Sequence, residues 1–274
     1  MRVVSSVCEL RSALSSSPVL VPTMGALHAG HLDLVQRARS SAGPKGQVAV
    51  SIFVNPIQFD RPGDLQAYPR TLESDLEKCR AAGVDLVFTP SADSMYFPDR
   101  SVTVMESSLS ATLCGATRPG HFDGVCTVVL KLFHQFQPSA AVFGEKDYQQ
   151  LAIIRRMVRD LDVPVEIIAA PTVREIDGLA MSSRNARLSE TQRADAPRIR
   201  RALLAAAETT EPTLLLATAR AAIESPLNRI DYLELVDAET LLPASDRSRP
   251  TLLATAVFYG EVRLIDNLLL PALG

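Results

Sequence analysis

The sequence has no excess of basic residues. Its 28 lysine and arginine residues are outnumbered by 31 aspartate and glutamate residues, so the formal net charge at pH 7 is -3. Nucleic-acid-binding domains usually carry a strongly basic face that neutralises phosphates. The composition therefore argues against a nucleic-acid partner.

Cysteine motifs for metal binding or redox chemistry are also missing. The four cysteines, Cys8, Cys79, Cys114 and Cys126, lie far apart and form no Cys-x-x-Cys pair. Structural zinc sites and dithiol redox centres usually use such closely spaced pairs. We therefore expect reduced thiols with a structural role.

No apolar run approaches the ~18 residues that a membrane span requires. The N-terminal segment is interrupted by Glu9 and Arg11 before Leu20, so it lacks the continuous apolar core of a signal peptide. We expect no membrane partner and a cytoplasmic location. The chain has 274 residues and 47% hydrophobic content, which suits one large domain, or a larger and a smaller one.

Short apolar runs alternate with longer amphipathic stretches in the first 185 residues. This alternation predicts βαβ units, in which a parallel sheet is covered by helices on both faces. The expected fold class is therefore α/β, with a Rossmann-like doubly wound parallel sheet. The expected strands are 19–22, 48–54, 85–89, 140–143 and 165–170, and the expected helices are 30–39, 75–82, 124–136 and 148–161.

The pattern changes after about residue 186. Ser189 is a suitable N-cap for a helix that continues to Ala207, and residues 213–223 predict a second helix. Strand-like stretches follow at 230–236, 252–259 and 261–265. We therefore expect two domains: a larger one over 1–185 and a smaller C-terminal α+β domain over 186–274 with a small antiparallel sheet.

Two of the four histidines, His28 and His31, lie three residues apart where a strand passes into a helix. Their imidazoles can face the same side of the first turn. Helix N-termini bind phosphate, and Gly25 and Gly30 allow a ligand to approach the backbone closely. The segment from Met24 to His31 thus predicts a nucleotide phosphate site. The alternatives are surface histidines beside a tight turn, and a metal-binding histidine pair that lacks a nearby carboxylate ligand motif.

A second group of candidates, residues 144–147, follows another predicted strand and precedes a helix, at the edge where open α/β folds bind ligands. Lys146 can neutralise phosphate, and Asp147 can hold a magnesium ion that bridges phosphate oxygens. A solvated charged turn is the alternative, and it is favoured for Glu145.

Three more segments carry polar side chains at positions where ligands could bind. Met181–Arg184 offers two hydroxyl groups and a cation in a loop that could close over a triphosphate. Asn55 and Gln58 follow a strand, where amides suit a neutral, hydroxylated or carboxylated substrate, although Asn-Pro is equally a turn signal. Gln149 and Gln150 open the helix after Asp147, and Arg118 and His121 lie in a glycine-rich loop, where they could contact a small anion but are by themselves ordinary loop residues.

Taken in order, these segments resemble the pantothenate synthetases, the AMP-forming pantoate–β-alanine ligases of the His-x-Gly-His nucleotidyltransferase superfamily. The motifs that carry the resemblance are 22–31, 53–59, 68–70, 118–122, 143–150 and 177–185. The part after residue 185 matches only in general character. The resemblance implies a homodimer that condenses (R)-pantoate with β-alanine through a pantoyl adenylate, using ATP and Mg2+.

The resemblance also implies roles for single residues. His31, His28, Lys146 and Arg184 would be catalytic, with His31 the usual proton donor, and Asp147 would lie near magnesium. Gln58 and Gln150 would hold pantoate, and Asn55, Tyr68, Arg118 and His121 would lie near the second substrate or the pocket mouth. The implied ATP-binding residues are Met24, Gly25, Ala26, Leu27, His28, Ala29, Gly30, His31, Gly144, Glu145, Lys146, Asp147, Val173, Met181, Ser182, Ser183 and Arg184.

Two other functions are compatible with parts of this pattern. A related nucleotidyltransferase would transfer AMP to a phosphorylated cofactor precursor, but Gln58 and Gln150 suit an uncharged diol better than a second phosphate. A catalytically inert nucleotide-binding regulator is the other alternative. Such a protein would have no need to retain His28, His31, Lys146 and Arg184 together.

Overall fold

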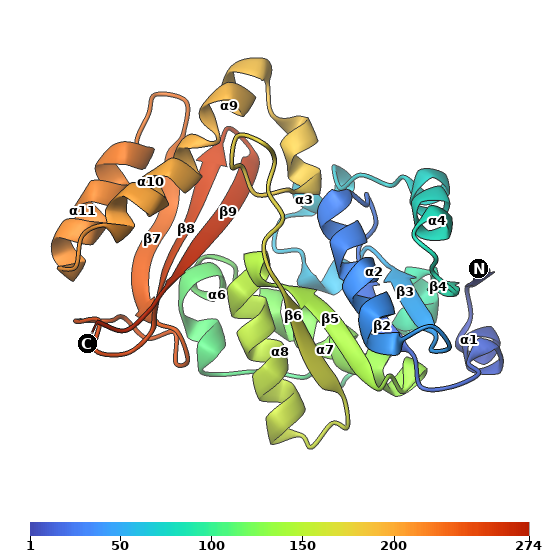
Figure 1. Cartoon of the computed structure of the whole chain (residues 1–274). Helices are drawn as coiled ribbons and strands as arrows, with labels where there is room; N and C mark the ends of the chain where they lie inside the picture. Colours follow the sequence, from blue (N-terminus) through green and yellow to red (C-terminus); the bar gives the residue numbers. More distant parts are fainter. Residues whose placement is uncertain (274) are drawn as a thin grey trace. The chain divides into compact units, whose positions relative to one another are not determined.

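The computed structural model describes residues 1–273, which form two compact units (Figure 1). The first unit comprises Met1–Glu106, Arg118–Glu145 and Ile153–Pro171. The second comprises Ser107–Thr117, Lys146–Ala152 and the chain from Thr172 onward. The chain therefore passes between the two units several times. The predicted domain limits, 1–185 and 186–274, stay a prediction.

The first unit is built on a six-stranded sheet in which all neighbouring strands run parallel. The strand order is β1-β4-β3-β2-β5-β6, so β2 lies in the interior beside β5, and the chain winds outward from this pair in both directions. The predicted doubly wound α/β fold is confirmed. The strands are β1 Arg2–Val4, β2 Val19–Thr23, β3 Val48–Ile52, β4 Leu86–Phe88, β5 Ala140–Gly144 and β6 Glu166–Ala170.

Helices cover both faces of this sheet because successive strand residues point to opposite sides. On one face Val19, Val21 and Val50 pack with Val35 and Ala38 of helix α2. On the other face Phe88 meets Phe136 of helix α7 edge-on, with ring centroids 5.7 Å apart. The helices of this unit are α1 Val7–Ala13, α2 Ala29–Ala42, α3 Pro62–Gln66, α4 Leu72–Ala81, α5 Ala92–Met95, α7 His121–Phe136 and most of α8 Tyr148–Asp160, with the 3-10 turn η1 Pro56–Gln58.

Two features of the first unit differ from the sequence-based expectation. The short strand β1 and helix α1 were not expected, although Ser6 and Glu9 form a capping box at the start of α1. Helix α7 begins at His121 rather than at Gly124, after Gly120 with a φ of 77°. His121 therefore lies in the first turn of a helix and not in a loop.

The second unit contains a three-stranded antiparallel sheet, β7-β8-β9, with β8 in the middle. Helices α10 and α11 pack together, and their apolar residues Leu203, Leu215 and Ile223 join the core formed by Leu253 and Val257 of β8. The elements are η2 Leu109–Ala111, α6 Leu113–Thr117, η4 Ser183–Arg187, α9 Glu190–Asp195, α10 Arg198–Ala207, α11 Pro212–Ile223, β7 Arg229–Asp237, β8 Thr251–Tyr259 and β9 Val262–Leu270; η3 Glu145–Asp147 lies where the two units join along the chain.

Two expectations for the C-terminal region were partly wrong. Ser189 does cap a helix, with a capping box to Gln192, but this helix ends at Asp195 and a new one starts after Pro197. Proline lacks an N–H and clashes with the preceding turn, so one continuous helix could not pass through it. Strand β9 also extends beyond Ile265 to Leu270, through the polar pair Asp266 and Asn267.

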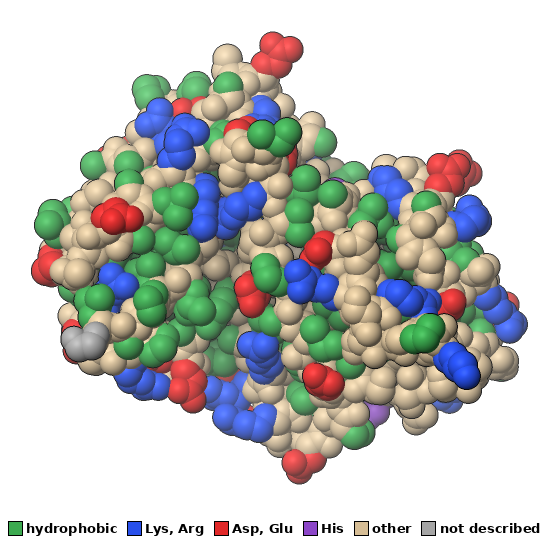
Figure 2. Space-filling model, in the orientation of Figure 1, with side chains coloured by type: hydrophobic (Ala, Val, Ile, Leu, Met, Phe, Trp, Pro, Cys, Tyr) green, Lys and Arg blue, Asp and Glu red, His purple; other side chains and the backbone are tan. Residues whose placement is uncertain are grey.

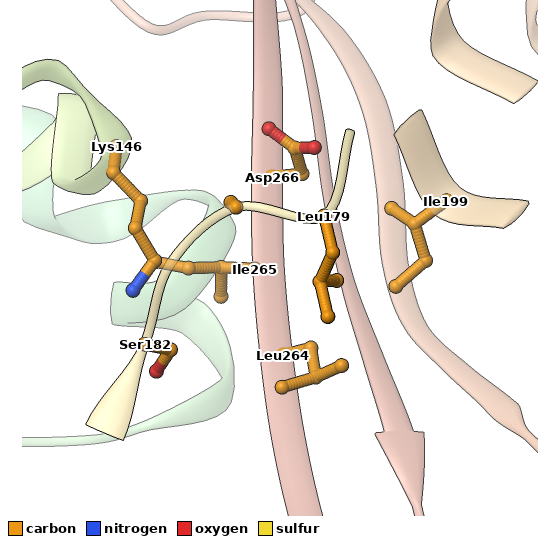
Figure 3. Close-up of a pocket in the computed structure, with 8 residues that line it drawn as sticks. Lys146, Leu179, Ser182, Ile199, Leu264, Ile265 and Asp266 are labelled. Atoms are coloured by element: carbon orange, nitrogen blue, oxygen red, sulfur yellow. The ribbon is translucent and has the colours of Figure 1, made fainter. Parts of the chain in front are cut away.

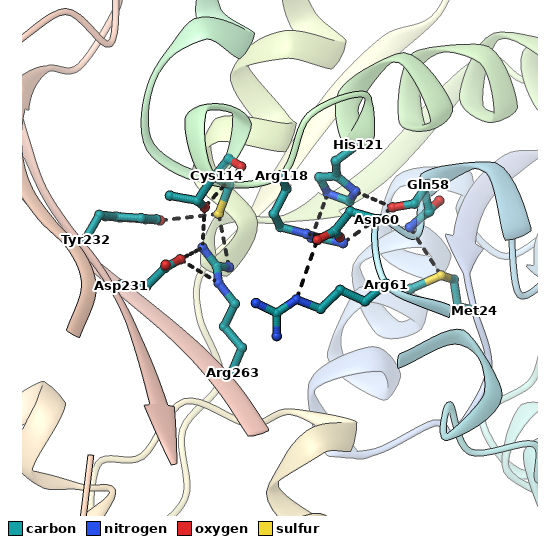
Figure 4. Close-up of polar contacts among 11 residues, drawn as sticks. Met24, Gln58, Asp60, Arg61, Cys114, Arg118, His121, Asp231, Tyr232 and Arg263 are labelled. Carbon is teal, nitrogen blue, oxygen red and sulfur yellow. Dashed lines mark hydrogen bonds and ion pairs between the residues drawn. The ribbon is translucent and has the colours of Figure 1, made fainter. Parts of the chain in front are cut away.

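Arg263 of β9 ties helix α6 to the antiparallel sheet (Figure 4). Its guanidinium donates to Asp231 at 2.7 and 2.9 Å, to Thr117 Oγ1 at 3.2 Å and to Cys114 Sγ at 3.4 Å. Cys114 Sγ also lies 3.3 Å from the Tyr232 hydroxyl. The cluster therefore has a structural role within the second unit.

The surface carries charges of both signs. On the face drawn in Figure 2, basic and acidic side chains are interspersed rather than gathered by sign. None of the helices described between residues 1 and 273 has the length and apolar character needed to cross a membrane.

Helix α7 and turn η1 approach each other closely at Gly124. A Cβ atom at this position would lie 2.4 Å from the Ile57 carbonyl oxygen and 2.7 Å from Gln58 N. Backbone atoms cannot move aside without shifting the whole turn. From the sequence, Gly124 was expected only as the first residue of a helix. Its lack of a side chain allows η1, which carries Gln58, to pack against α7.

We predict that Gly124→Ala lowers the free energy of unfolding by about 1–3 kcal/mol, the usual range for overpacking. The measurement is urea unfolding. Gly63→Ala is the matched control, because nothing lies within 4 Å of its added Cβ in the exposed helix α3. It should leave stability unchanged or raise it by up to about 1 kcal/mol. Equal stability of the two variants would contradict the close approach.

Candidate active site

The turn after β2 has an unusual backbone. Gly25 and Ala26 both have positive φ values, 79° and 50°. Such a conformation is strained for alanine and persists only where the surroundings fix it. Thr23 Oγ1 accepts from Gly25 N at 3.2 Å and donates to the Ser51 carbonyl of β3 at 2.8 Å, which ties the turn to the neighbouring strand.

The main anchor of this turn is Asp75 in the first part of α4. Its two carboxylate oxygens accept from Ala26 N and Leu27 N, each at 2.8 Å, and Thr71 Oγ1 donates to it at 3.2 Å. Only 1% of Asp75 is exposed. One helical turn further on, Lys78 Nζ donates to the Leu27 carbonyl at 2.7 Å. Helix α4 thus binds two backbone N–H groups and one backbone carbonyl of the turn that precedes His28.

His28 and His31 both use Nδ1 to cap helix α2. His28 Nδ1 accepts from Gly30 N at 3.1 Å, and His31 Nδ1 accepts from His28 N at 3.3 Å. The ring centroids are 4.1 Å apart. Since Nδ1 is an acceptor in each ring, the proton of each neutral imidazole lies on Nε2. The hydrogen bonds of the helix cap therefore set the tautomer of both imidazole rings, and each ring has an N–H group at Nε2.

Three backbone N–H groups at the start of this helix have partners within the chain. Gly30 N donates to the His28 ring, and the N–H groups of His31 and Leu32 donate to the His28 carbonyl at 2.9 and 3.2 Å. The expectation that backbone N–H groups here bind phosphate stays a prediction.

Asn55 and Gln58, both in or beside η1, have different roles in the structure. Asn55 is 1% exposed, and its amide nitrogen donates to Gln58 Oε1 at 2.8 Å and to the Gly124 carbonyl at 3.1 Å. Its oxygen accepts from the Tyr96 hydroxyl at 2.7 Å. Gln58 Nε2 instead donates to Met24 Sδ at 3.2 Å. A thioether is a weak acceptor, so a ligand can readily replace it. Asn55 therefore positions Gln58, whose amide can turn to a substrate.

Arg118 and His121 join the same cluster (Figure 4). His121 Nδ1 lies 2.8 Å from the Gln58 carbonyl and must donate to it, so Nε2 accepts from Arg118 at 3.1 Å. Arg118 Nε also donates to Asp60 at 2.8 Å. Burial alone would raise the pKa of Asp60, but the hydrogen bond and charge of Arg118 hold it below its usual value. The first unit thus brings Met24, Gln58, Arg118 and His121 together.

In the second unit, Lys146 and Ser182 line a pocket with residues of β9 (Figure 3). The amino end of Lys146 and the hydroxyl of Ser182 lie on the same side in this view. Burial lowers the pKa of Lys146 and the Arg184 cation lowers it further, while Asp147 and Asp266 oppose both effects. Two cations close enough to destabilise each other are suited to an anionic ligand. The other lining residues are Leu179, Ala180, Ile199, Leu264, Ile265 and Asp266.

The segment that carries Ser182 is ordered by several hydrogen bonds and is not a plain loop. Ser182 caps the 3-10 turn η4 by accepting from Arg184 N at 3.2 Å. Met181 N donates to the Val173 carbonyl at 3.0 Å. Asn185 Nδ2 bonds Glu175 at 2.8 Å and the Ala180 carbonyl at 3.1 Å. Val173, Met181, Ser182 and Arg184 therefore belong to one compact segment.

The remaining candidates are placed as follows. Gly144 ends β5 beside the central strand β2, and Tyr68 is buried with its ring edge-on to Phe59. Gln149 is structural, since its amide bonds the backbone of Leu109, Thr112 and Cys114. Gln150, its neighbour on α8, is only partly buried.

Asp147 is exposed beside Lys146. Within residues 1–273 no three histidine, cysteine, aspartate or glutamate side chains form a metal site. Magnesium is usually held by one or two carboxylates together with the substrate's phosphates, so a single exposed carboxylate fits that manner of binding.

The sequence-based reasoning missed Asp75, Lys78 and Asn267. Each bonds the backbone of a candidate segment from a distance of about 48 to 121 positions along the chain. One signal was available for Asn267: it forms with Asp266 two consecutive polar residues within a strand whose other residues, apart from Arg263, are apolar.

The chain is similar to known proteins over nearly its whole length. The sequence model of the family described as pantoate-beta-alanine ligase matches residues 2–269. The pantothenate synthetase of Akkermansia muciniphila is 56% identical over 279 residues, which cover 98% of this chain and 99% of that protein.

Two solved structures are similar in fold as well as in sequence. The crystal structure of pantothenate synthetase from Thermus thermophilus has a TM-score of 0.93 at 50% identity and covers 98% of this chain and 99% of that one. The pantoate-beta-alanine ligase from Francisella tularensis, complexed with beta-gamma ATP and beta-alanine, has a TM-score of 0.81 at 32% identity, with 98% and 97% coverage.

We predict that Asp75→Asn lowers the free energy of unfolding by about 1–3 kcal/mol, because an amide presents N–H to one of two buried backbone donors. Thermal or urea unfolding measures this loss. Glu73→Gln removes a charge from the same first turn of α4 at an exposed position, so it controls for the helix dipole. If both variants lose the same stability, the Asp75 bonds to Ala26 and Leu27 do not anchor the turn.

Proposed function

We infer, because the chain belongs to the pantoate-beta-alanine ligase family, that it joins pantoate to β-alanine at the expense of ATP. In the first step a carboxylate oxygen of pantoate attacks the α-phosphorus of ATP, and the bond to pyrophosphate breaks. In the second step the β-alanine amine forms a C–N bond with the acyl carbon of pantoyl adenylate. AMP leaves with the former carboxylate oxygen, and the amine loses a proton.

The observation that carries this proposal is the pair of imidazoles at the turn after β2. Adenylation increases negative charge on the α-phosphate and on the departing pyrophosphate, and donors fixed in advance stabilise such charge at little reorganisation cost. The helix cap keeps the Nε2–H tautomer of His28 and His31. We propose that these groups bind the ATP phosphates, and that His31 stabilises charge rather than transferring a proton, since pyrophosphate can leave unprotonated.

Lys146 and Arg184 are proposed to hold the triphosphate with Ser182 and Ser183. Burial and mutual repulsion disfavour the Lys146 ammonium in the unliganded protein, as its lowered pKa indicates. A triphosphate would relieve that repulsion, so part of the binding energy comes from charges already gathered in the second unit. Asp147 would bind Mg2+ together with the phosphates, and the metal would neutralise the departing pyrophosphate.

Gln58 is proposed to hold pantoate because Asn55 donates to its amide oxygen while its amide nitrogen donates to the weak acceptor Met24 Sδ, which a substrate can replace. Gln150 would be its second amide, and Tyr68, Arg118 and His121 would border the β-alanine pocket. The nucleotide would contact the remaining residues of 24–31 and 144–147, with Val173 and Met181. We also propose a homodimer, from the family resemblance, and a cytoplasmic location, from the composition.

We predict that purified protein with ATP, Mg2+, pantoate and β-alanine forms AMP, pyrophosphate and pantothenate in equal amounts. Chromatography of nucleotides and product measures this. Omission of pantoate should abolish pyrophosphate release, and omission of β-alanine should leave only the first step. AMP formation without pantoate, or transfer of AMP to a phosphorylated acceptor, would overturn the proposed function.

Another prediction concerns the proposed role of His31 in adenylation. His31→Ala should slow pantoate-dependent exchange of labelled pyrophosphate into ATP by roughly 100-fold or more, the effect of losing one fixed donor to developing charge. ATP binding, measured by calorimetry, should weaken far less. His134→Ala removes an exposed histidine of α7 and should change neither quantity. Equal losses in exchange and binding would show that His31 acts in binding alone.

A further inference from the structure

Strand β9 contains a polar pair where its pattern calls for apolar residues. Asp266 is 5% exposed, and it lies with Asn267 between Ile265 and Leu268. A buried carboxylate is costly unless hydrogen bonds satisfy it, so such a pair in a strand requires a reason. Asn267 donates to the backbone of Lys146, and Asp266 lines the same pocket as Lys146.

Asn267 fixes the backbone of Lys146. Its Nδ2 donates to the Lys146 carbonyl at 2.9 Å. Lys146 lies in η3, a 3-10 turn of three residues, and such turns have few hydrogen bonds of their own. A donor from 121 positions further along the chain therefore limits how far the main chain of Lys146 can move.

Asp266 is held rigidly at the wall of the pocket that Lys146 also lines. Arg174 donates to its two oxygens, each at 2.8 Å, and Asn267 N donates to Oδ1 at 2.8 Å. This two-point, charge-assisted pairing fixes the plane of the carboxylate. Its position is therefore set independently of Lys146.

We propose that Asn267 and Asp266 are positioning residues for Lys146: Asn267 holds its main chain, and Asp266 places a fixed carboxylate in the wall of the pocket that Lys146 also lines. The proposal rests on the proposed role of Lys146 in binding the triphosphate. The C-terminal sheet thereby contributes to adenylation without touching a substrate.

Such a role predicts a selective defect. Lys146 serves the step in which the triphosphate is broken, whereas aminolysis of pantoyl adenylate involves no triphosphate. Asn267→Ala should therefore slow pantoate-dependent pyrophosphate–ATP exchange roughly tenfold, because small displacements of a catalytic group are costly. When pantoyl adenylate and β-alanine are supplied directly, the rate of pantothenate formation should change by less than about twofold. Twofold is about the deviation seen between sites that do not interact.

Asn228→Ala is the matched control. Asn228 Nδ2 also donates to a backbone carbonyl in the second unit, that of Ile223 at 2.9 Å, but it does not line the Lys146 pocket. It should affect stability without changing the ratio of the two half-reactions. If Asn267→Ala proves unstable, Asn267→Ser retains a donor and should lie between the wild type and the alanine variant in exchange rate.

A double-mutant cycle with Lys146→Ala separates this inference from the proposed function. If Asn267 acts through Lys146, Asn267→Ala should have little further effect, about twofold or less, in a chain that already carries Lys146→Ala. Full additivity, or equal loss in both half-reactions, would overturn the positioning role. A Lys146→Ala variant with normal exchange would instead refute the role of Lys146 itself and, with it, this inference.

Discussion

The turn that precedes His28 depends on one carboxylate, that of Asp75. Gly25 and Ala26 adopt left-handed backbone conformations, and the bonds from Ala26 N and Leu27 N to Asp75 hold them there. The direction in which the chain enters helix α2 follows from this turn, and the imidazole caps follow from that direction. A residue that touches no phosphate thus fixes the geometry of the two side chains proposed to do so.

Much of the fold could be predicted because its signals are local. Parallel strands that are buried on both faces are continuous apolar runs, as in Val19–Thr23 and Val48–Ile52, and Ser189 was identified as a cap from its side chain alone. The errors arose where local signals were short or conflicting. Strand β1 has three residues, Pro197 breaks an alanine-rich helical pattern, and Asp266 with Asn267 resembles a turn inside a strand.

The sequence indicated which residue types belong to the candidate site, but not the hydrogen-bonding role of each residue. Asn55 and Gln58 carry the same functional group, yet one amide is fully hydrogen-bonded within the protein and the other donates to a thioether. Histidines His28 and His121 likewise differ in tautomer, because one ring accepts a backbone N–H through Nδ1 and the other donates from Nδ1 to a carbonyl. These distinctions come from partners distant in sequence, so no motif could contain them.

The position of β9 has a consequence for incomplete genes. All six motifs of the family end by residue 185, so a gene interrupted before Val262 would still contain every one of them. Its product would lack the amide that bonds the Lys146 carbonyl and the carboxylate beside it. It would also leave β8, whose nine residues are all buried, as an unprotected sheet edge that promotes aggregation. A classification by motifs alone would therefore count this truncated polypeptide as a working ligase, although its exposed sheet edge would promote aggregation.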